Sequence, residues 1–344
     1  MSNNHCLVGK VIVLAKWTAA VVLAAGFALS ASAQTGNPGG PINDNLGEMD
    51  YGVCRGIDPS CFHNWPRPAT TEYRVLLFTR TGSSRHADLG PSLGPGLNPP
   101  LKDGNVVQRE MRRLMAANGI ELDYTEDVEQ LQAPRLNGYN AVIFFSTSRD
   151  ILDDGAKTAL RQYMRAGGGF VAIHNAFGTL YNWPYYEGLL GGANFYDHGQ
   201  ERTGDVVIVD DKDVSTKGIG ARFHFKDEWY NLIPFPTHVR FLATVDEKSW
   251  TPLPPRRQFA GPPREGAVEP PPLPSVVGRD PGHGDFHPVA WCQYYDGGKV
   301  WATTLGHDAN DFAADDSQFA GAKEFQHLIV DGIKSVMGAE PFCQ

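Results

Sequence analysis

Three histidines and one acidic pair stand out in the sequence because of their positions beside short apolar runs. His174 ends one run, His86 lies in the loop after another, and His307 follows a third. Asp227 and Glu228 stand next to two aromatic residues further along the chain. Imidazole and carboxylate groups together can bind zinc or another divalent transition metal, and a single histidine can act as a general base or hydrogen-bond donor. We predict a catalytic site of these five residues centred on His174, with the three histidines as candidate metal ligands.

The sequence leaves three interpretations of this set open. The histidines do not follow a compact ligand pattern such as His-x-x-x-His, so a metal site depends on the fold bringing distant residues together. A metal-free polar site needs the same convergence, whereas purely structural histidines need none. His198 and His224 are expected to be structural or surface residues.

Aromatic residues near these positions indicate a carbohydrate ligand. The flat C–H faces of sugar rings stack on Trp and Tyr, while Asn and His side chains form hydrogen bonds with the hydroxyl groups. The aromatic residues can equally be core residues, and a histidine before a proline can simply close a loop. The expected substrate-binding residues are Trp183, Tyr186, Trp229, Tyr230, Asn175 and His287.

The elements that must position these residues are predicted from patterns in the first half of the chain. Four short segments bounded by turn residues are typical of strands, two of them (74–79 and 141–146) apolar enough to be covered on both faces. Apolar residues at helical spacing and a cap at Asp153 predict helices between them. This alternation predicts an α/β domain with a mostly parallel central sheet, whose carboxyl edge collects the loops that carry the histidines. The predicted strands are residues 74–79, 121–125, 141–146 and 170–174.

The second half of the chain is less regular. Residues 252–282 are dense in proline, a composition that does not pack a core, so they are predicted to form an exposed insertion. An Asp-Gly-Gly turn at 296–298 predicts a hairpin. The elements predicted here are strands at 205–209 and 239–245, a hairpin of 288–294 and 299–305, and a closing helix at 319–337.

Longer motifs add a family resemblance to this pattern. AGGGFVAIH, DEWYN and LGH are specific as a combination, and they occur in family order with four further matches. The chain resembles the ThuA-like (trehalose utilisation) family of the class I glutamine amidotransferase-like superfamily. The resemblance implies a flavodoxin-like three-layer sandwich over residues 73–338, followed by a tail at 339–344, and a role in carbohydrate use. The matching segments are 84–86, 141–150, 166–176, 183–186, 227–231, 287–292 and 298–307.

The relation to amidotransferases does not extend to their chemistry. A glutaminase needs a cysteine nucleophile at a sharp strand-to-helix turn, activated by a nearby histidine. The corresponding turn here reads Ile173-His174-Asn175-Ala176, with no cysteine near it. We therefore predict that the protein is not a glutaminase, because activity depends on the site and not on the fold.

The first residues predict export to the periplasm or the extracellular space. Lys10 and Lys16 flank the start of an apolar run, and Ala31-Ser32-Ala33 fits a cleavage site, so residues 1–33 are predicted to be a signal peptide. Removing them takes two of the 30 basic residues and none of the 39 acidic ones, which leaves 28 against 39 and a net charge of −11. Nucleic acid and anionic membranes are therefore not expected partners. No later segment is apolar and long enough to span a bilayer.

Four of the five cysteines lie after the predicted cleavage site. Export favours a disulfide between Cys54 and Cys61, within an irregular lead segment at 34–72. Cys292 lies in an apolar strand-like run and is predicted to be a buried free thiol. Cys343 can pair with either early cysteine, because sequence alone does not fix connectivity.

These observations predict an exported carbohydrate-active enzyme that acts on a small saccharide. The expected reaction is hydrolysis or proton transfer on a sugar or keto-sugar derivative, and the candidate cofactor is a divalent metal such as zinc. The alternative is a non-catalytic carbohydrate-binding or accessory protein, which needs the aromatic residues but no ordered histidine cluster. A thiol or redox enzyme is disfavoured, because Cys292 lies in the middle of a predicted strand.

Overall fold

The computed structural model describes most of the chain that follows the predicted signal peptide. The signal peptide itself, most of the predicted lead segment and residues 253–280 of the predicted insertion lie outside the described residues. The described ranges, all within one unit that spans Asn45–Gln344, are 52–65, 73–252, 281–314 and 316–344.

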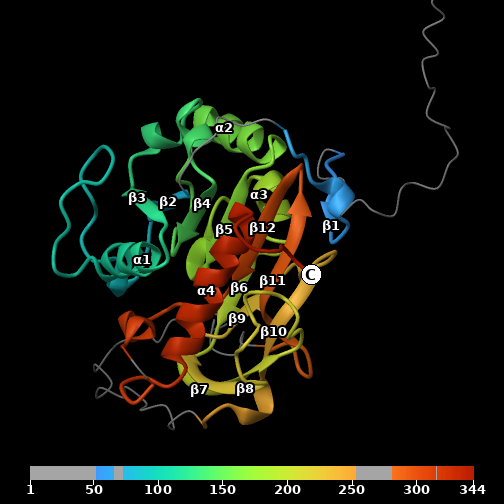
Figure 1. The fold of residues 1–344 in the computed structure, drawn as a ribbon. Coiled ribbons are helices and arrows are strands. Elements are labelled where there is room, and N and C mark those ends of the chain that lie inside the picture. The colour runs from blue at the N-terminus through green and yellow to red at the C-terminus, as the bar shows by residue number, and fades with distance from the viewer. Residues whose placement is uncertain (1–51, 66–72, 253–280, 315) are drawn as a thin grey trace, which may run out of the picture. The chain divides into compact units, whose positions relative to one another are not determined.

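A ten-stranded mixed sheet forms the centre of this unit. The described residues form twelve strands, of which all but β6 and β9 belong to this sheet. They are β1 (Arg55–Gly56), β2 (Arg74–Phe78), β3 (Glu121–Thr125), β4 (Ala141–Phe145), β5 (Gly169–Ile173), β6 (Phe195–His198), β7 (Arg202–Ile208), β8 (Arg222–Asp227), β9 (Tyr230–Leu232), β10 (Arg240–Asp246), β11 (His287–Tyr295) and β12 (Gly298–Thr303). The order in the large sheet is β3-β2-β4-β5-β12-β11-β10-β7-β8, with β1 paired to β11 (Figure 1). Strands β3 to β12 in this order run parallel, and the strands beyond β12 are antiparallel. The predicted parallel core is confirmed.

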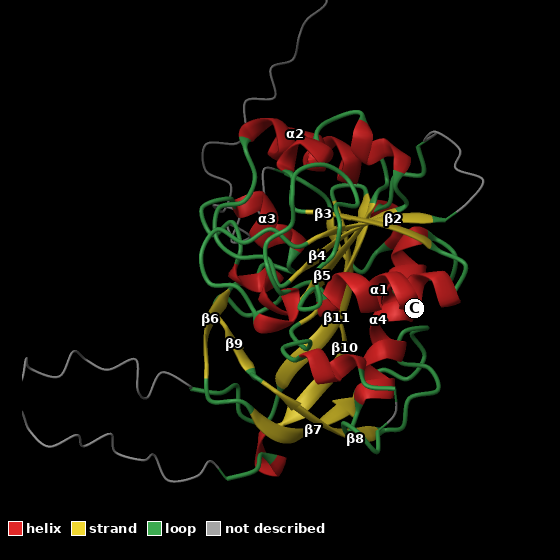
Figure 2. Cartoon of the chain, turned by 90° about the vertical axis from the view of Figure 1, so that its left-hand side faces the viewer, coloured by secondary structure: helices red, strands yellow, loops and turns green. Residues whose placement is uncertain are grey.

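Helices cover both faces of the sheet, as Figure 2 shows. The side chains of a strand alternate between the two faces. Leu77 of β2 therefore packs in the cluster that contains α1 and α4, whereas its neighbour Leu76 packs in the cluster that contains α2 and α3. The predicted three-layer sandwich is confirmed. The helices are α1 (Val106–Ala117), α2 (Asp154–Arg165), α3 (Pro184–Leu189) and α4 (Ala322–Met337).

The helix that leads into β5 begins and ends as the sequence predicts. The carboxylate of Asp153 accepts a hydrogen bond from the backbone N–H of Ala156 at the start of α2. Gly167, with a φ of 87°, follows the last turn and reverses the chain. Strand β5 then starts at once and ends at Ile173, which fixes the position of the next residue, His174.

The less regular half contains the predicted elements and three strands that were not predicted. The hairpin of β11 and β12, strands β7 and β10, and helix α4 are all present. Strands β6 and β9 pair with each other in a separate two-stranded sheet, and β8 pairs with β7. Strand β9 has only three residues, too few for a pattern to reveal it. In β8, Phe223 and Phe225 alternate with Arg222, His224 and Lys226, a half-buried strand pattern that the prediction missed.

The disulfide pairing confirms one prediction and corrects another. Cys54 and Cys61 form the expected bridge near the start of the described chain. Cys292 is not a free thiol, because it forms a disulfide with Cys343, and their Cα atoms lie 5.8 Å apart. The C-terminal tail returns to the sheet, where Phe342 is buried against Tyr294 of β11. The sequence did not reveal this return, because 51 positions separate the two cysteines.

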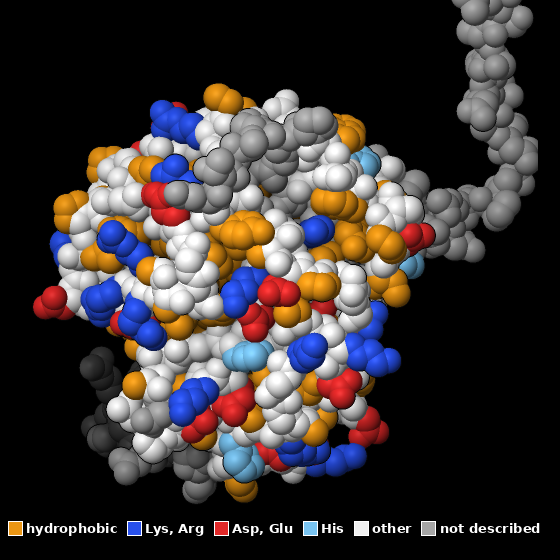
Figure 3. All heavy atoms as spheres, in the orientation of Figure 1, with side chains coloured by type: hydrophobic (Ala, Val, Ile, Leu, Met, Phe, Trp, Pro, Cys, Tyr) orange, Lys and Arg blue, Asp and Glu red, His pale blue; other side chains and the backbone are white. Residues whose placement is uncertain are grey.

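Among the described residues, no helix combines the length and apolarity that a membrane span needs. On the face drawn in Figure 3, acidic and basic side chains are interspersed with apolar ones.

Candidate active site

His174 occupies a sharp turn at the carboxyl edge of the parallel sheet. It follows β5 directly and adopts a φ of 53°, in the left-handed region that side chains other than glycine rarely adopt. Strained backbone of this kind is concentrated at functional sites. Strand β5 lies between β4 and β12 in the parallel part of the sheet, where ligands bind at the carboxyl ends of strands. The geometry presents the His174 imidazole at this edge.

Hydrogen bonding fixes the tautomer of His174. Its Nδ1 lies 2.9 Å from the backbone carbonyl of Thr304, which can only accept, so Nδ1 carries the hydrogen and Nε2 carries the lone pair. Three further polar atoms approach this single lone pair. The Tyr230 hydroxyl lies 2.9 Å from Nε2, His86 Nε2 lies 3.2 Å away, and His307 Nδ1 lies 3.4 Å away. The His174 side chain is fully buried, so water does not share this role.

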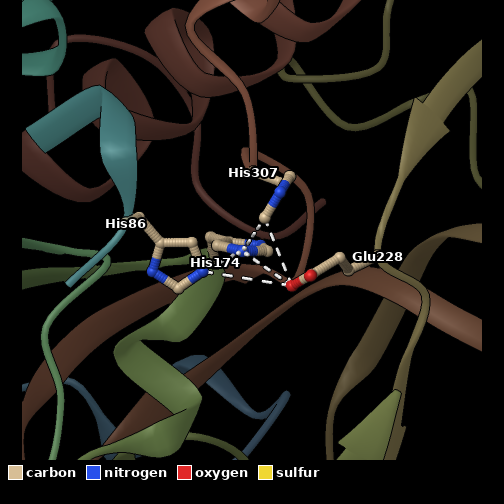
Figure 4. Close-up of side chains that lie close together, drawn as sticks. All are labelled: His86, His174, Glu228 and His307. Carbon is tan, nitrogen blue, oxygen red and sulfur yellow. Dashed lines mark hydrogen bonds and ion pairs between the residues drawn. The ribbon is translucent and has the colours of Figure 1, made fainter. Parts of the chain in front are cut away.

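Glu228 completes the cluster from the side opposite His86 (Figure 4). Its Oε2 lies 3.2 Å from His307 Nδ1. The same oxygen lies 3.9 Å from His174 Nε2 and 4.0 Å from His86 Nε2. The four candidate ligand atoms all lie within 4.8 Å of one another. The structure therefore brings together residues that are up to 221 positions apart.

This spacing fits a divalent metal ion. Zinc binds nitrogen and oxygen ligands at about 2.0–2.2 Å in tetrahedral geometry, which places neighbouring ligand atoms about 3.4 Å apart. Five of the six separations among these atoms are 3.2 to 4.0 Å and surround that value, and all six lie within 4.8 Å. The carbonyl of Thr304 holds the other ring nitrogen of His174, the arrangement that orients histidine ligands in metal sites. His86, His174, His307 and Glu228 can thus hold one ion together.

The opposite charges of His307 and Glu228 stabilise each other. Although burial opposes a charge on His307, its hydrogen bond and ion pair with Glu228 raise the pKa of His307 to about 9. Burial likewise opposes a charge on Glu228, but the neighbouring His307 and His86 rings hold the pKa of this carboxyl below its ordinary value. Without a metal, the cluster therefore contains an ion pair between His307 and Glu228.

Asp227, predicted to be catalytic, lies beneath the cluster and organises it. Its side chain is fully buried and accepts hydrogen bonds from the backbone N–H groups of Gly306 (2.9 Å) and Glu228 (2.7 Å). Burial raises the pKa of the Asp227 carboxyl above its ordinary value. One bond comes from the residue before His307 and the other from Glu228 itself, so Asp227 joins the loop that carries His307 to the end of the strand that precedes Glu228.

Two cavities open beside the cluster. The smaller has a volume of about 240 Å³, and the larger has a volume of about 410 Å³. Arg85 and His86 line both cavities, while Glu228 faces the smaller and His307 faces the larger. Other residues of the smaller cavity are Ser84, Asn175, Phe195, His198 and Tyr230.

Only two of the six predicted substrate-binding residues line either of these cavities. Tyr230 and Asn175 line the smaller cavity. His287 lies behind it, where its Nε2 donates to the backbone carbonyl of Tyr230 at 2.9 Å. The remaining three, Trp183, Tyr186 and Trp229, line neither cavity.

Packing explains why these three residues lie away from the cavities. Tyr186 is fully buried and stacks on Phe144 of the sheet. Trp229 is also buried and stacks on Trp250. Core contacts leave Tyr186 and Trp229 without a free face for a sugar ring, which corrects the expectation that they bind substrate. Trp183 is half-buried and stacks on Tyr185 of α3.

Four residues of the smaller cavity, Ser84, Arg85, Phe195 and His198, were not among the predicted site residues. The edge of Phe195 packs against Tyr230 with 4.6 Å between ring centroids, and His198 stacks on the same ring. His198 Nε2 also lies 3.5 Å from Glu228 Oε2. A register shift between Phe195 and Asp197 interrupts the pairing of β6 with β9. Such a bulge re-aims side chains, so strand alternation could not have placed both residues on one ring.

Comparisons with known proteins agree with the fold. One solved structure, a ThuA-like protein from Bacteroides uniformis, has a TM-score of 0.53 at 19% identity, covering 79% of this chain and 95% of that one. A ThuA-like protein from Parabacteroides merdae has a TM-score of 0.53 at 14% identity, covering 78% of this chain and 91% of that one. No curated protein matches the chain. Residues 101–333 match the ThuA family, described as trehalose utilisation, and the chain therefore belongs to this family.

Proposed function

We propose that the protein is an exported, metal-assisted enzyme that acts on a sugar or a keto-sugar derivative. The observation that carries the proposal is the convergence of His86, His174, His307 and Glu228 beside two cavities at the carboxyl edge of the sheet. A non-catalytic binding protein needs aromatic faces and hydroxyl partners but gives no reason for this convergence. Family membership supports a role in carbohydrate use.

The smaller cavity suits a single sugar unit. Its volume of about 240 Å³ lies below the range of about 300–1,000 Å³ that is typical of pockets for drug-sized ligands. Phe195 and Tyr230 supply apolar surface, and Ser84, Asn175 and His198 supply hydrogen-bonding groups. This mixture matches the apolar faces and hydroxyl rim of a sugar ring.

The cluster assigns distinct roles to its members. Three imidazoles are enough to hold an ion in catalytic sites that keep one position open. A divalent metal bound there supplies a Lewis acid that polarises a carbonyl or hydroxyl oxygen of the substrate. Glu228 lies at the cavity wall and accepts the proton that the reaction releases, either from water in a hydrolysis or from the carbon beside a carbonyl.

The predicted signal peptide supports an activity outside the cytoplasm, where an enzyme meets scavenged saccharides. The charge of −11 after cleavage agrees with a small neutral saccharide as partner, and not with a polyanion.

Metal analysis followed by a saccharide screen tests the proposal. Purified protein is analysed by mass spectrometry for bound metal, and its turnover of sugars and keto-sugars is measured with and without added zinc, manganese or cobalt. We expect about one ion per chain and metal-dependent turnover, both lost in His174→Ala and retained in the control His224→Ala, whose side chain is exposed. Unchanged turnover in His174→Ala contradicts the central assignment, and sugar binding without turnover supports the binding-protein alternative.

A further inference from the structure

The edge of β9 that faces away from β6 is completed by two histidine side chains. Among the described strands, β9 pairs only with β6, so its other edge has no neighbouring strand. The backbone carbonyl of Tyr230 accepts from His287 Nε2 at 2.9 Å. The backbone N–H of Leu232 donates to His283 Nε2 at 2.9 Å. Buried backbone groups need such partners, and the two imidazoles supply them where a strand would otherwise do so.

One carboxylate oxygen joins the two histidines. Glu247 Oε1 accepts from His287 Nδ1 at 2.8 Å, from the backbone N–H of Gly284 at 3.0 Å, and from the backbone N–H of His283. We call Glu247, His283 and His287 the edge clamp. It holds the start of β11 against β9, the strand that follows Glu228 in the chain.

Hydrogen-bond partners distinguish the two histidines of the edge clamp. Both ring nitrogens of His287 lie beside acceptors, a carboxylate and a carbonyl. His283 Nε2 accepts an N–H and therefore has a lone pair. Burial, together with the electrostatic effect of His287, lowers the pKa of His283 to about 4, in agreement with a neutral ring. His287 is fully buried, and a hydrogen bond to an ionised carboxylate is stronger than one to a neutral acceptor, so removing the charge of Glu247 weakens its hold on His287.

The residue that the edge clamp holds reaches the metal cluster. The Tyr230 hydroxyl lies 2.9 Å from His174 Nε2, and that nitrogen has one lone pair. A metal ion bound through this lone pair would leave the Tyr230 hydroxyl without this acceptor, so its hydrogen would be free to donate elsewhere. The Tyr230 ring is held in the cavity wall by contacts with Phe195 and His198.

We propose that the edge clamp positions Tyr230, whose hydroxyl donates a hydrogen bond to the substrate oxygen at the metal. His287 and Glu247 are then positioning residues that act through the backbone of Tyr230, and Tyr230 is the catalytic residue. The inference rests on the proposed metal-assisted function. If the edge clamp were only structural, changes at His287 would not be linked to the metal.

Cobalt binding by the whole protein tests this link, with Co²⁺ alone as the probe. Tyr230→Phe removes a hydrogen bond that the metal must break, so we expect Co²⁺ to bind about 2- to 10-fold more tightly. His287→Gln cannot hold both partners, so it frees Tyr230 and tightens Co²⁺ binding in the same direction. In the double variant His287→Gln adds nothing, and the exposed control His224→Gln changes nothing. Additive effects, or weaker Co²⁺ binding in His287→Gln, overturn the positioning role.

A second variant and a second readout distinguish loss of the positioning role from misfolding and from failure of the proposed function. Glu247→Gln keeps an acceptor for all three clamp contacts but removes the negative charge. We expect it to tighten Co²⁺ binding as His287→Gln does, in protein that thermal unfolding shows to be folded. On a substrate from the saccharide screen, both variants lower kcat with little change in KM, and neither lowers it further in Tyr230→Phe. If the wild-type protein binds no Co²⁺, the proposed function fails; if it binds Co²⁺ and the variants are additive, only the positioning role fails.

Discussion

Nε2 of His174 lies 3.2 Å from Nε2 of His86, although 88 positions separate the two residues in the chain. Two such nitrogens can share at most one hydrogen, and His174 Nε2 carries none because its ring donates through Nδ1. With His307 and Glu228 at similar distances, the fold holds three imidazole nitrogens and one carboxylate around a common point. Groups of this kind are the ligands that a divalent transition metal prefers.

Replacing His174 separates its chemistry from its role in the fold. Asn adopts the left-handed conformation of this position more readily than His, so His174→Asn offsets part of the lost packing by relieving backbone strain. We expect His174→Asn to melt within a few degrees of the wild-type protein while losing metal binding by more than about 100-fold. Calorimetry and metal titration measure the two effects, and a variant that keeps wild-type affinity refutes the ligand role.

Glu228→Gln distinguishes a metal ligand from a proton acceptor. The amide keeps the shape and one acceptor oxygen but cannot take a proton, so we expect turnover to fall by about 10²–10⁴-fold. Metal affinity should fall much less, by no more than about 10-fold, because three imidazoles remain. Turnover and metal content are measured on the same preparation. Loss of the metal together with the activity shows instead that Glu228 is an essential ligand.

The sequence predicted the parallel half of the fold and the central histidines because both follow from local patterns. Continuous apolar segments marked β2, β4 and β5, and His174 stands directly after one of them. The positions of Phe195 and His198 could not be predicted, since a bulge in β6 sets their direction. The bond between Cys292 and Cys343 depends on a tail that returns across the sheet, a long-range contact without a local signal. Aromatic residues near the site in sequence, such as Tyr186, proved to be core residues, because long-range packing and not the local sequence decides their burial.

Metal binding should release a proton near neutral pH. The pKa of His307 is raised to about 9 in the metal-free protein, so the ring carries a proton below that pH, and this proton must leave before Nδ1 can bind a metal. Apparent affinity should therefore rise by about 10-fold per pH unit between pH 7 and 9 and then level off. Calorimetry in two buffers of different ionisation enthalpy counts the protons released. A flat profile over this range contradicts the assignment of His307 as a ligand.

Removing the bond between Cys292 and Cys343 should destabilise the protein more than removing the bond between Cys54 and Cys61. The first disulfide closes a loop between residues 51 positions apart, and the second closes a loop between residues only 7 positions apart. Chain entropy alone predicts losses of about 4 and about 2.5 kcal/mol respectively, because a longer loop restricts the unfolded chain more. Paired Ala variants, Cys292→Ala with Cys343→Ala and Cys54→Ala with Cys61→Ala, are compared by denaturant unfolding under oxidising and reducing conditions. Metal affinity should change in neither pair, since none of the four cysteines belongs to the cluster. Equal losses in the two pairs, or no loss on reduction of the wild-type protein, would show that the C-terminal tail is held by its packing and not by the disulfide.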